Sequence, residues 1–461
     1  MQMRLILLAL VAVLVFSLSA CMGGEASTGL DPKATQKDAA DGGNEKEEVN
    51  LSVWLMPNSA DTVSDFLDIT KPYTDQNPHV KINATVIDWG AAWTRLTSAA
   101  TTGSAPDISQ LGSTWVAGIG SMGALVDLSD KIDGDKFVDA TKQFTGIRGR
   151  SEMYGMPWFT ETRALFYRID ACEKAGVDPK TDFDTWDSFK NSLQKLNNIQ
   201  IDGKKLPALG MPGKNDWNVI HNFSFWIYGA GGEFVSSDGL KATFSDDKSL
   251  EGINFYVELA VEGLMDHTSL ENDTNHIESM YAAGEYCTSF MGPWVITDLK
   301  RNKADDGNDI IDKTGIGLVP EGPEGRFAFA GGSVLSVFNS SKNIGEAVAL
   351  LDYLSGLDAQ LAYSEVTGNL PTTVEAYDDP AISGDPYKSI FKEQMKYGKH
   401  YASIPGWAPA ESIFQSGLSI VWDNAMGIGD VYSRERTKAI IEDVEEELNQ
   451  LLEENAVELI E

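Results

Sequence analysis

The sequence predicts an α/β fold that contains a parallel sheet and divides into about two to three domains. The first observation is that segments rich in β-branched residues alternate with segments of helical periodicity from residue 49 onward, which is the order that βαβ units produce. The second is the length of 461 residues, which exceeds what one compact core holds. The third is a composition with 42% hydrophobic and 10% aromatic residues, which is typical of a globular chain.

The first part of the chain shows this alternation most clearly. The run VNLSVWLM is apolar and β-branched, as expected of a strand, and Gly103 stands where a helix would end. In order, the pattern predicts strands at 49–56, 80–88 and 105–112, with helices at 61–78 and 91–103 between them.

The alternation returns after residue 163. The segment 181–198 has Asp182 or Asp184 as a candidate N-cap and then apolar side chains at helical spacing, namely Trp186, Phe189, Leu193 and Leu196. The pattern also predicts a strand and helix within 163–176, helices at 248–265 and 344–356, and strands at 285–294, 314–320 and 332–343. The tail from Arg434 is expected to be a helix with one apolar face, formed by Ile440, Ile441, Val444, Leu448, Leu451 and Leu452, and one acidic, solvated face.

The chain is strongly acidic. It has 36 basic and 69 acidic residues, for a formal charge of −33. Such a chain is repelled by nucleic acid and by anionic lipid surfaces. The charge therefore favours an uncharged or cationic small partner, or else contributes only to solubility.

The N-terminal segment predicts a location outside the cytoplasm. The apolar run 5–16 is too short to span a bilayer, which needs about 20 residues, and has the length of a signal-peptide core. The residues Leu18-Ser19-Ala20-Cys21 that follow resemble the lipobox of bacterial lipoprotein precursors. The resemblance implies a signal peptide at 1–20 and a diacylated Cys21 that anchors the mature chain to the outer face of a membrane. The alternative is an ordinary secretory signal. Residues 21–48 have the composition of a flexible tether.

The remaining cysteines and the histidines give no support for a metal or cofactor. Cys172 and Cys287 are 115 positions apart, and either a disulfide or two buried thiols is compatible with the sequence. No transition-metal motif is present, and the five histidines are scattered. We therefore expect no metal, no cofactor and no nucleic-acid partner.

A series of short motifs resembles a known family. In chain order they are APDI (105–108), LVDLSD (125–130), YGMPW (154–158), ETRALFYRIDACEKAG (161–176), DTWDSF (184–189), YAAGEYCTSFMGPW (281–294), GIGLVPEGPEG (315–325), AGGSVLSVFNSSKN (330–343) and TGNLP (367–371). Together they resemble the family-1 extracellular solute-binding proteins of ABC importers, the relatives of maltose-binding protein, over essentially residues 50–450.

The resemblance implies two α/β lobes hinged by three crossover segments, with a ligand cleft between the lobes. Carried onto this sequence, one lobe would be 49–157 plus 316–365, and the other 158–315 plus 366–461. The crossovers would fall near 157–161, 315–320 and 365–371.

A carbohydrate receptor needs flat aromatic rings for the C–H faces of a sugar and polar side chains for its hydroxyls. Trp294 is the strongest candidate, because the Gly-Pro-Trp of the family presents its indole to the sugar. Trp115, with Thr114 beside it, follows the third expected strand, at the edge where open α/β sheets bind ligands. Trp407, between two prolines, is a candidate second platform.

The remaining candidates have credible structural roles as well. Glu161 matches an acidic residue that binds sugar hydroxyls in the family, and Trp158 lies beside it in the first crossover. Arg163 would donate to the ligand or simply pair with Glu161. Gly332 would let a ligand approach the backbone or form a turn. The weaker candidates are Asn58, Trp217 and Asn222, whereas Trp54, Trp186 and Trp226 are expected in the core.

These observations predict a lipid-anchored, monomeric substrate-binding component of an ABC importer. It would bind a carbohydrate, most simply an oligosaccharide, and deliver it to membrane permease subunits without catalysis. Three alternatives stay open: a secreted glycoside hydrolase, a binding protein for a non-sugar solute, and an adhesive surface lipoprotein. The sequence has no G-x-S-x-G or Walker A motif, so no catalytic residue is named.

Overall fold

The computed structural model describes residues 47–201, 203–214, 216–301 and 309–460, without the side chains of 456–460. The expected signal peptide, Cys21 and the tether as far as residue 46 lie outside the described residues. Among the residues that are described, no helix combines the length and the apolar character needed to cross a membrane.

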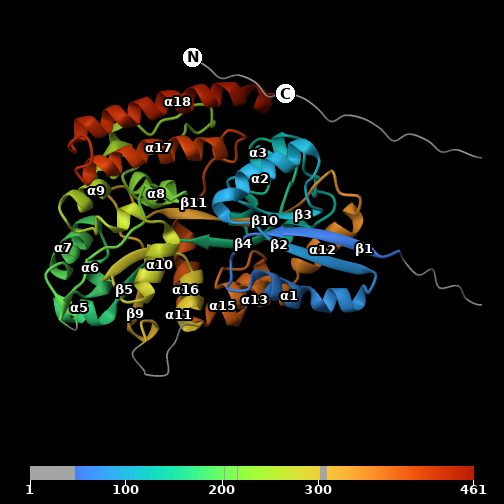
Figure 1. The fold of residues 1–461 in the computed structure, drawn as a ribbon, viewed down its shortest axis with the longest axis horizontal. Helices are drawn as coiled ribbons and strands as arrows, with labels where there is room; N and C mark the ends of the chain where they lie inside the picture. Colours follow the sequence, from blue (N-terminus) through green and yellow to red (C-terminus); the bar gives the residue numbers. More distant parts are fainter. Residues whose placement is uncertain (1–46, 202, 215, 302–308, 461) are drawn as a thin grey trace, which may run out of the picture. The chain divides into compact units, whose positions relative to one another are not determined.

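The larger sheet has six strands and carries most of the first expected βαβ units (Figure 1). Its strand order is β11-β10-β3-β1-β2, and β4 pairs with β10. The strands β1, β2 and β3 are parallel to one another, as predicted, whereas β10 runs antiparallel to both β3 and β4. The bounds are β1 Val49–Leu55, β2 Val80–Val86, β3 Ile108–Gly112, β4 Met156–Thr162, β10 Ala328–Val337 and β11 Gly398–Lys399.

The helices that connect these strands begin and end near the predicted positions. Asp61 accepts a hydrogen bond from the Ser64 backbone at the start of α1, and Gly103 ends α2 in the left-handed conformation, with φ 68°. The helices associated with this sheet are α1 Thr62–Gln76, α2 Trp89–Thr102, α3 Val116–Ser121, α12 Ile344–Leu354 and α13 Leu357–Thr367.

The second sheet differs from the prediction. It contains β5 Ala164–Arg168, β8 Thr288–Met291 and β9 Thr314–Gly317 in the order β8-β5-β9. Both pairings are antiparallel, so the expectation of parallel pairing is wrong here. The alternation of strands and helices in the sequence does not specify which strands meet, because more than one hundred residues separate β5 from its two neighbours.

The remaining elements are mostly helical. The longer helices are α7 Trp186–Leu196, α8 Val219–Gly229, α9 Asp247–Val261, α10 Thr274–Ala282, α11 Trp294–Arg301, α16 Pro386–Gln394, α17 Trp407–Ala425 and α18 Arg434–Ile460. The short elements are α4 Asp139–Lys142, α5 Ile169–Ala175, α6 Pro179–Asp182, α14 Val374–Asp378, α15 Pro380–Ser383, β6 Gln200–Ile201, β7 Lys204–Lys205, and the 3-10 turns at 134–136, 269–271, 311–313 and 395–397.

The chain passes between the two sheets at identifiable points. The strand β4 of the larger sheet leads through Arg163 directly into β5 of the second sheet, and β9 of the second sheet is followed by β10 of the larger one. The backbones of Thr160 and Leu370 exchange two hydrogen bonds, so the segment after α13 also lies beside β4. The lobe boundaries given above remain a prediction.

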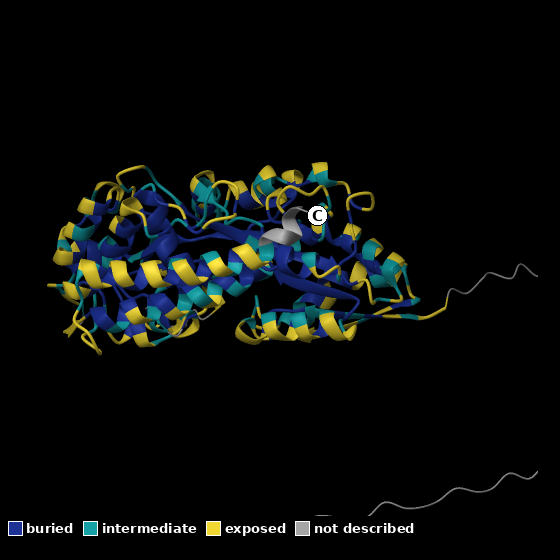
Figure 2. Cartoon of the chain, turned by 90° about the horizontal axis from the view of Figure 1, so that it is seen from above, coloured by how far each residue is buried: buried dark blue, intermediate teal, exposed yellow. Residues whose placement is uncertain are grey.

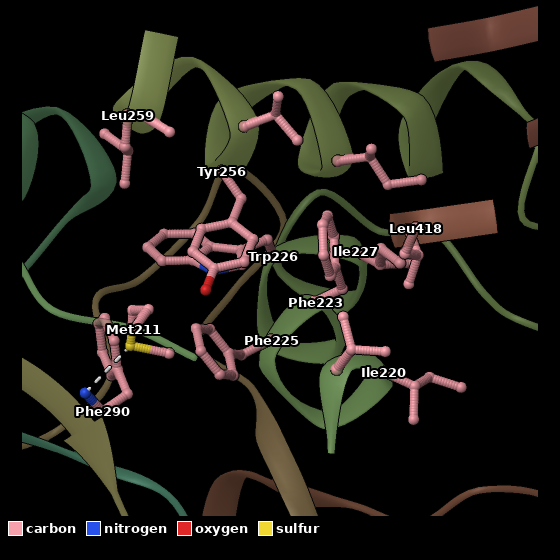
Figure 3. Packing of buried hydrophobic residues seen from close by; sticks show 14 of the residues in the cluster. Met211, Ile220, Phe223, Phe225, Trp226, Ile227, Tyr256, Leu259, Phe290 and Leu418 are labelled. Carbon is pink, nitrogen blue, oxygen red and sulfur yellow. Dashed lines mark hydrogen bonds between the residues drawn. The ribbon is translucent and has the colours of Figure 1, made fainter. Parts of the chain in front are cut away.

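The hydrophobic core around α8 is rich in aromatic residues. All residues of α8 are buried, and Trp226 is 0% exposed. Figure 3 shows Trp226 beside Tyr256 of α9, with Phe223, Phe225 and Phe290 around them. The expectation that Trp186 and Trp226 lie in the core is confirmed by their burial and their mutual contact at 5.4 Å. Trp54 is only partly buried, with the Arg95 guanidinium 4.7 Å from its ring centroid.

The C-terminal helix α18 packs beside α17 (Figure 1) and has a buried stripe and an exposed stripe (Figure 2). Five of the six residues on the predicted apolar face are buried, and Leu451 is partly buried. A Cβ at Gly417 of α17 would lie 2.1 Å from Val444, which shows how closely the two helices approach. The predicted apolar face is therefore confirmed, and it packs on α17.

Helix α7 begins differently from the prediction. Its N-cap is Thr185, not Asp182 or Asp184, and Thr185 and Ser188 form a reciprocal capping box. The Ser188 backbone N–H donates to the Thr185 hydroxyl at 3.3 Å.

We expect Thr185→Ala to lower the free energy of unfolding by about 1 kcal/mol, because the backbone donors of the first turn lose their acceptor. Urea denaturation measures the change. Gln194→Ala, on the exposed face of the same helix, is the control and should be nearly neutral. Equal effects of the two substitutions would contradict the role of the cap.

Candidate ligand-binding site

Arg163 lies at the junction of β4 and β5, where the chain leaves one sheet for the other, and it is 4% exposed. Its guanidinium donates to the carboxylate of Glu161. It also lies over the ring of Trp294, 4.8 Å from the centroid, and 6.0 Å from that of Phe329. The pairing with Glu161 that the sequence left open is therefore present, and it places both side chains among aromatic rings.

Trp294 follows β8 and is the first residue of α11, whereas the sequence pattern predicted that the strand continues to this residue. Its indole N–H donates to the Glu278 carboxylate of α10 at 2.8 Å. The ring therefore has Arg163 against its face and a carboxylate at its edge.

A second group of rings continues from Phe329 of β10. The imidazole of His221 stacks on Phe329 with centroids 4.0 Å apart and shares a hydrogen bond of 2.9 Å with the Tyr401 hydroxyl. Tyr401 stacks on Trp407, the first residue of α17, at 4.6 Å. Burial, with a smaller effect of Arg163, holds the pKa of His221 well below its usual value, so this imidazole is neutral.

A third group contains indoles from segments far apart in the sequence. Trp115 stands between β3 and α3, and Trp89 begins α2. The ring of Trp89 lies 5.6 Å from that of Trp115 and stacks on Trp217 at 5.7 Å, with 16° between the planes. Trp217, which precedes α8, is 37% exposed and contacts His221 edge-on. These contacts join the indole group to the ring group of His221.

The carboxylate of Glu411, one turn after Trp407 on α17, connects the groups. Its carboxyl group accepts a hydrogen bond from the Trp407 indole at 3.2 Å, and it lies close enough to the Thr114 and Trp115 side chains for both to lower its pKa. Thr114, Trp115 and Trp407, all expected at the site, therefore meet at one carboxyl group that the sequence reasoning missed.

Two expected site residues lie elsewhere. Trp158 is 1% exposed in the core under the larger sheet, where it packs on Tyr363 with centroids 4.2 Å apart. The Asn58 amide donates to the same Tyr363 hydroxyl at 2.9 Å and to Gln110 at 3.0 Å. Their contacts with Tyr363 give both residues a structural role, and their role in binding stays a prediction.

Gly332 and Asn222 are connected less directly to the rings and polar groups described above, which together form the Arg163 cluster. Gly332 lies inside β10, not in a turn, and has a φ of 142°. A Cβ there would come within 2.1 Å of the Phe159 carbonyl oxygen, so the close approach that needs a glycine is that of β4. Asn222 adjoins His221 on α8, is 4% exposed, and its Nδ2 has no partner among the described residues.

Three acidic residues of the site were absent from the sequence-based set. Burial raises the pKa of Asp216 to about 6, of Glu411 to about 7 and of Glu278 to about 8. A signal existed for two of them: Asp216 precedes the candidate Trp217, and Glu411 follows Trp407 by one helical turn. Nothing in the sequence marked Glu278.

The raised pKa of Glu278 predicts a pH dependence of stability. Between about pH 4.5 and 8 the folded protein holds a proton on Glu278 that the unfolded chain releases, so this group makes stability fall as the pH rises through that window. We expect Glu278→Gln to reduce the fall seen in unfolding curves between pH 5 and 9. Glu173→Gln, on the exposed surface of α5, should keep the wild-type slope, and an unchanged slope in Glu278→Gln would contradict the assignment.

The described residues contain no group of three or more His, Cys, Asp or Glu side chains placed to hold a metal ion. Cys172 and Cys287 are buried free thiols. The cluster as described thus consists of aromatic rings, carboxyl groups, one guanidinium and amides. This is the equipment for binding a polar organic molecule with apolar faces.

The chain is similar in sequence to known binding proteins. The Diacetylchitobiose binding protein DasA of Streptomyces coelicolor is 28% identical over 431 residues, which cover 89% of this chain and 91% of that protein. The Maltodextrin-binding protein MdxE of Bacillus subtilis is 23% identical over 70% of this chain and 74% of its own length. Both are binding proteins.

Solved structures share the fold. The GacH receptor of Streptomyces glaucescens superposes with a TM-score of 0.75 at 22% identity, over 88% of this chain and 99% of that one. Maltose-bound MalE3 of T. maritima gives a TM-score of 0.75 at 18% identity, over 87% and 99%. The two-lobe solute-binding fold predicted from the motifs is therefore confirmed. The family described as bacterial extracellular solute-binding protein matches residues 68–389, and the chain belongs to that family.

Proposed function

We propose that this protein is the substrate-binding component of an ABC importer and that it binds a carbohydrate at the cluster around Arg163. The observation that carries the proposal is a continuous set of contacts around Arg163, which connects Trp294 to Trp407 through the rings of Phe329, His221 and Tyr401. Buried carboxyl groups lie at both ends, Glu278 beside Trp294 and Glu411 beside Trp407 and Trp115. Indole faces suit the C–H faces of a sugar, and carboxyl groups accept hydrogen bonds from its hydroxyls.

The relatives support a saccharide over other solutes. The printed names of DasA and MdxE refer to diacetylchitobiose and maltodextrin, and GacH and MalE3 were solved with acarbose and maltose. Another relative, UgpB, is named for sn-glycerol-3-phosphate, with 24% identity over 60% of this chain. A phosphorylated ligand would need basic groups, whereas the cluster holds several carboxyl groups and Arg163.

The same proposal includes a lipid anchor that attaches the protein to the cell. Membership of an extracellular family agrees with a location outside the cytoplasm. The lipobox-like residues before Cys21 support an anchor of two acyl chains on the outer face of a membrane. A monomer tethered in this way would deliver its ligand to permease subunits in the same membrane.

A panel of mono- and oligosaccharides, with glycerol-3-phosphate as a non-sugar arm, tests the function. Tryptophan fluorescence and the release of reducing ends are followed together. We expect one saccharide series to shift the emission and to raise the Tm by mass action, with no new reducing ends. New reducing ends would indicate a glycoside hydrolase instead, a response to glycerol-3-phosphate alone would indicate a non-sugar receptor, and no response would favour an adhesive role.

A further inference from the structure

The candidate site contains more acidic than basic side chains. The carboxyl groups of Glu161, Asp216 and Glu278 all lie close enough to Arg163 to feel its charge. Glu411 adds a fourth carboxyl group, bonded to the Trp407 indole that stacks on Tyr401. Against these four acids, the cluster as the structure describes it holds the single guanidinium of Arg163, which is already paired with Glu161.

The arrangement does not suit a metal ion. In the described part of the chain, no three acidic, histidine or cysteine side chains converge on one point. The carboxyl groups are instead spread over different elements: Asp216 before α8, Glu278 on α10 and Glu411 on α17. Such spacing fits an organic ligand that reaches several of them.

Two buried amide side chains near the carboxyl groups each have one polar atom without a partner among the described residues. Asn218 is 5% exposed; its backbone N–H donates to Asp216 at 2.9 Å and its Nδ2 to Thr274 at 3.4 Å, but its Oδ1 receives no hydrogen bond from the described residues. In Asn222, one turn further along, the Nδ2 has no acceptor in the described part of the chain. A buried acceptor without a donor is unfavourable, so a ligand that supplies an N–H group at Asn218 would remove this cost. A hydroxyl oxygen would serve Asn222.

We propose that the ligand is a saccharide that carries a protonated amino group. An ammonium group has three donors and no acceptor, which matches a surplus of carboxyl groups and the free Asn218 oxygen. Indole faces also attract cations, and the hydroxyls of the sugar would use the remaining polar groups. The inference rests on the proposed function and specifies the class of its substrate. The raised pKa values of Glu278 and Glu411 agree with it, because carboxyl groups that lack a cation stay protonated.

Three disaccharides that differ only at the C2 substituent test the inference. Chitobiose carries amino groups, N,N′-diacetylchitobiose carries acetamido groups, and cellobiose carries hydroxyls. Calorimetric titration of the full chain at pH 7 and low salt should show chitobiose binding at least about 10-fold more tightly than the other two, and the advantage should shrink as salt is added.

Two variants test whether the Glu278 carboxyl group causes the preference for an amino group. Glu278→Gln keeps an acceptor for the Trp294 indole but cannot become an anion, and we expect it to weaken chitobiose binding about 10-fold. The exposed Glu173→Gln should leave the affinity unchanged. If any neutral saccharide of the panel binds as tightly as chitobiose or more tightly, the inference is overturned while the proposed function stands. If no saccharide binds, both are overturned.

Discussion

Replacing Trp294 by alanine is expected to weaken saccharide binding about 100-fold, the largest effect of any single change in the site. Tryptophans are enriched among the few residues that contribute about 2 kcal/mol or more to a binding surface, and about 1.4 kcal/mol corresponds to a factor of ten. Here the substitution removes a platform and also leaves Glu278 without its donor and Arg163 without the ring beneath it. Isothermal titration with the best saccharide of the panel measures the effect.

A second variant separates the two contributions of the indole. Trp294→Phe retains an aromatic face but loses the N–H that donates to Glu278. We expect it to bind between the wild type and the alanine variant. Thermal unfolding of both variants verifies that the fold is intact, and wild-type affinity in folded Trp294→Ala would remove this indole from the site.

Replacing Gly332 by alanine is expected to lower the free energy of unfolding by about 3 kcal/mol. The new Cβ would meet the Phe159 carbonyl oxygen at 2.1 Å and the Thr160 Cα at 2.8 Å, both of them backbone atoms of β4 that cannot rotate away. The φ of 142° is also strained for any residue with a Cβ. Overpacking and backbone strain each cost about 1–3 kcal/mol.

The matched control is Gly345→Ala. Gly345 lies in α12, and a Cβ there would meet nothing within 4 Å. Because alanine restricts the unfolded chain and favours helix, this change should stabilise the protein by about 0.5–1 kcal/mol. Urea denaturation measures the free energy of unfolding of both variants. If Gly332→Ala is as stable as Gly345→Ala, β4 and β10 are less tightly packed than described.

The sequence predicted local structure well because local structure depends on local patterns. The strand-helix order around β1 to β3, the end of α2 at Gly103 and the apolar face of α18 all follow from side-chain periodicity and glycine. The antiparallel second sheet did not follow, since β5 pairs with strands more than one hundred residues away. Periodicity carries no information on such partners.

The site was predictable only in part, for a similar reason. Trp294 was chosen from the Gly-Pro-Trp of the resembling family, Trp115 from its position after a strand and Trp407 from its place between two prolines. The structure connects them through Arg163, the rings beside it and the Glu411 carboxyl group. Trp158 was chosen from its place in the first crossover, but it packs on Tyr363 in the core, and its sequence position gives no information on that partner. Glu278 has no sequence neighbour at the site, and only the fold of α10 brings it to the Trp294 indole.

A crystal structure of the full chain with the saccharide that the panel selects would show the binding site directly. We expect density for an intact saccharide in contact with Trp294, within hydrogen-bond distance of Glu278 or Arg163, and held between the segments of the two sheets. A saccharide bound elsewhere on the surface, with the Arg163 cluster packed as it is without a ligand, would contradict this expectation.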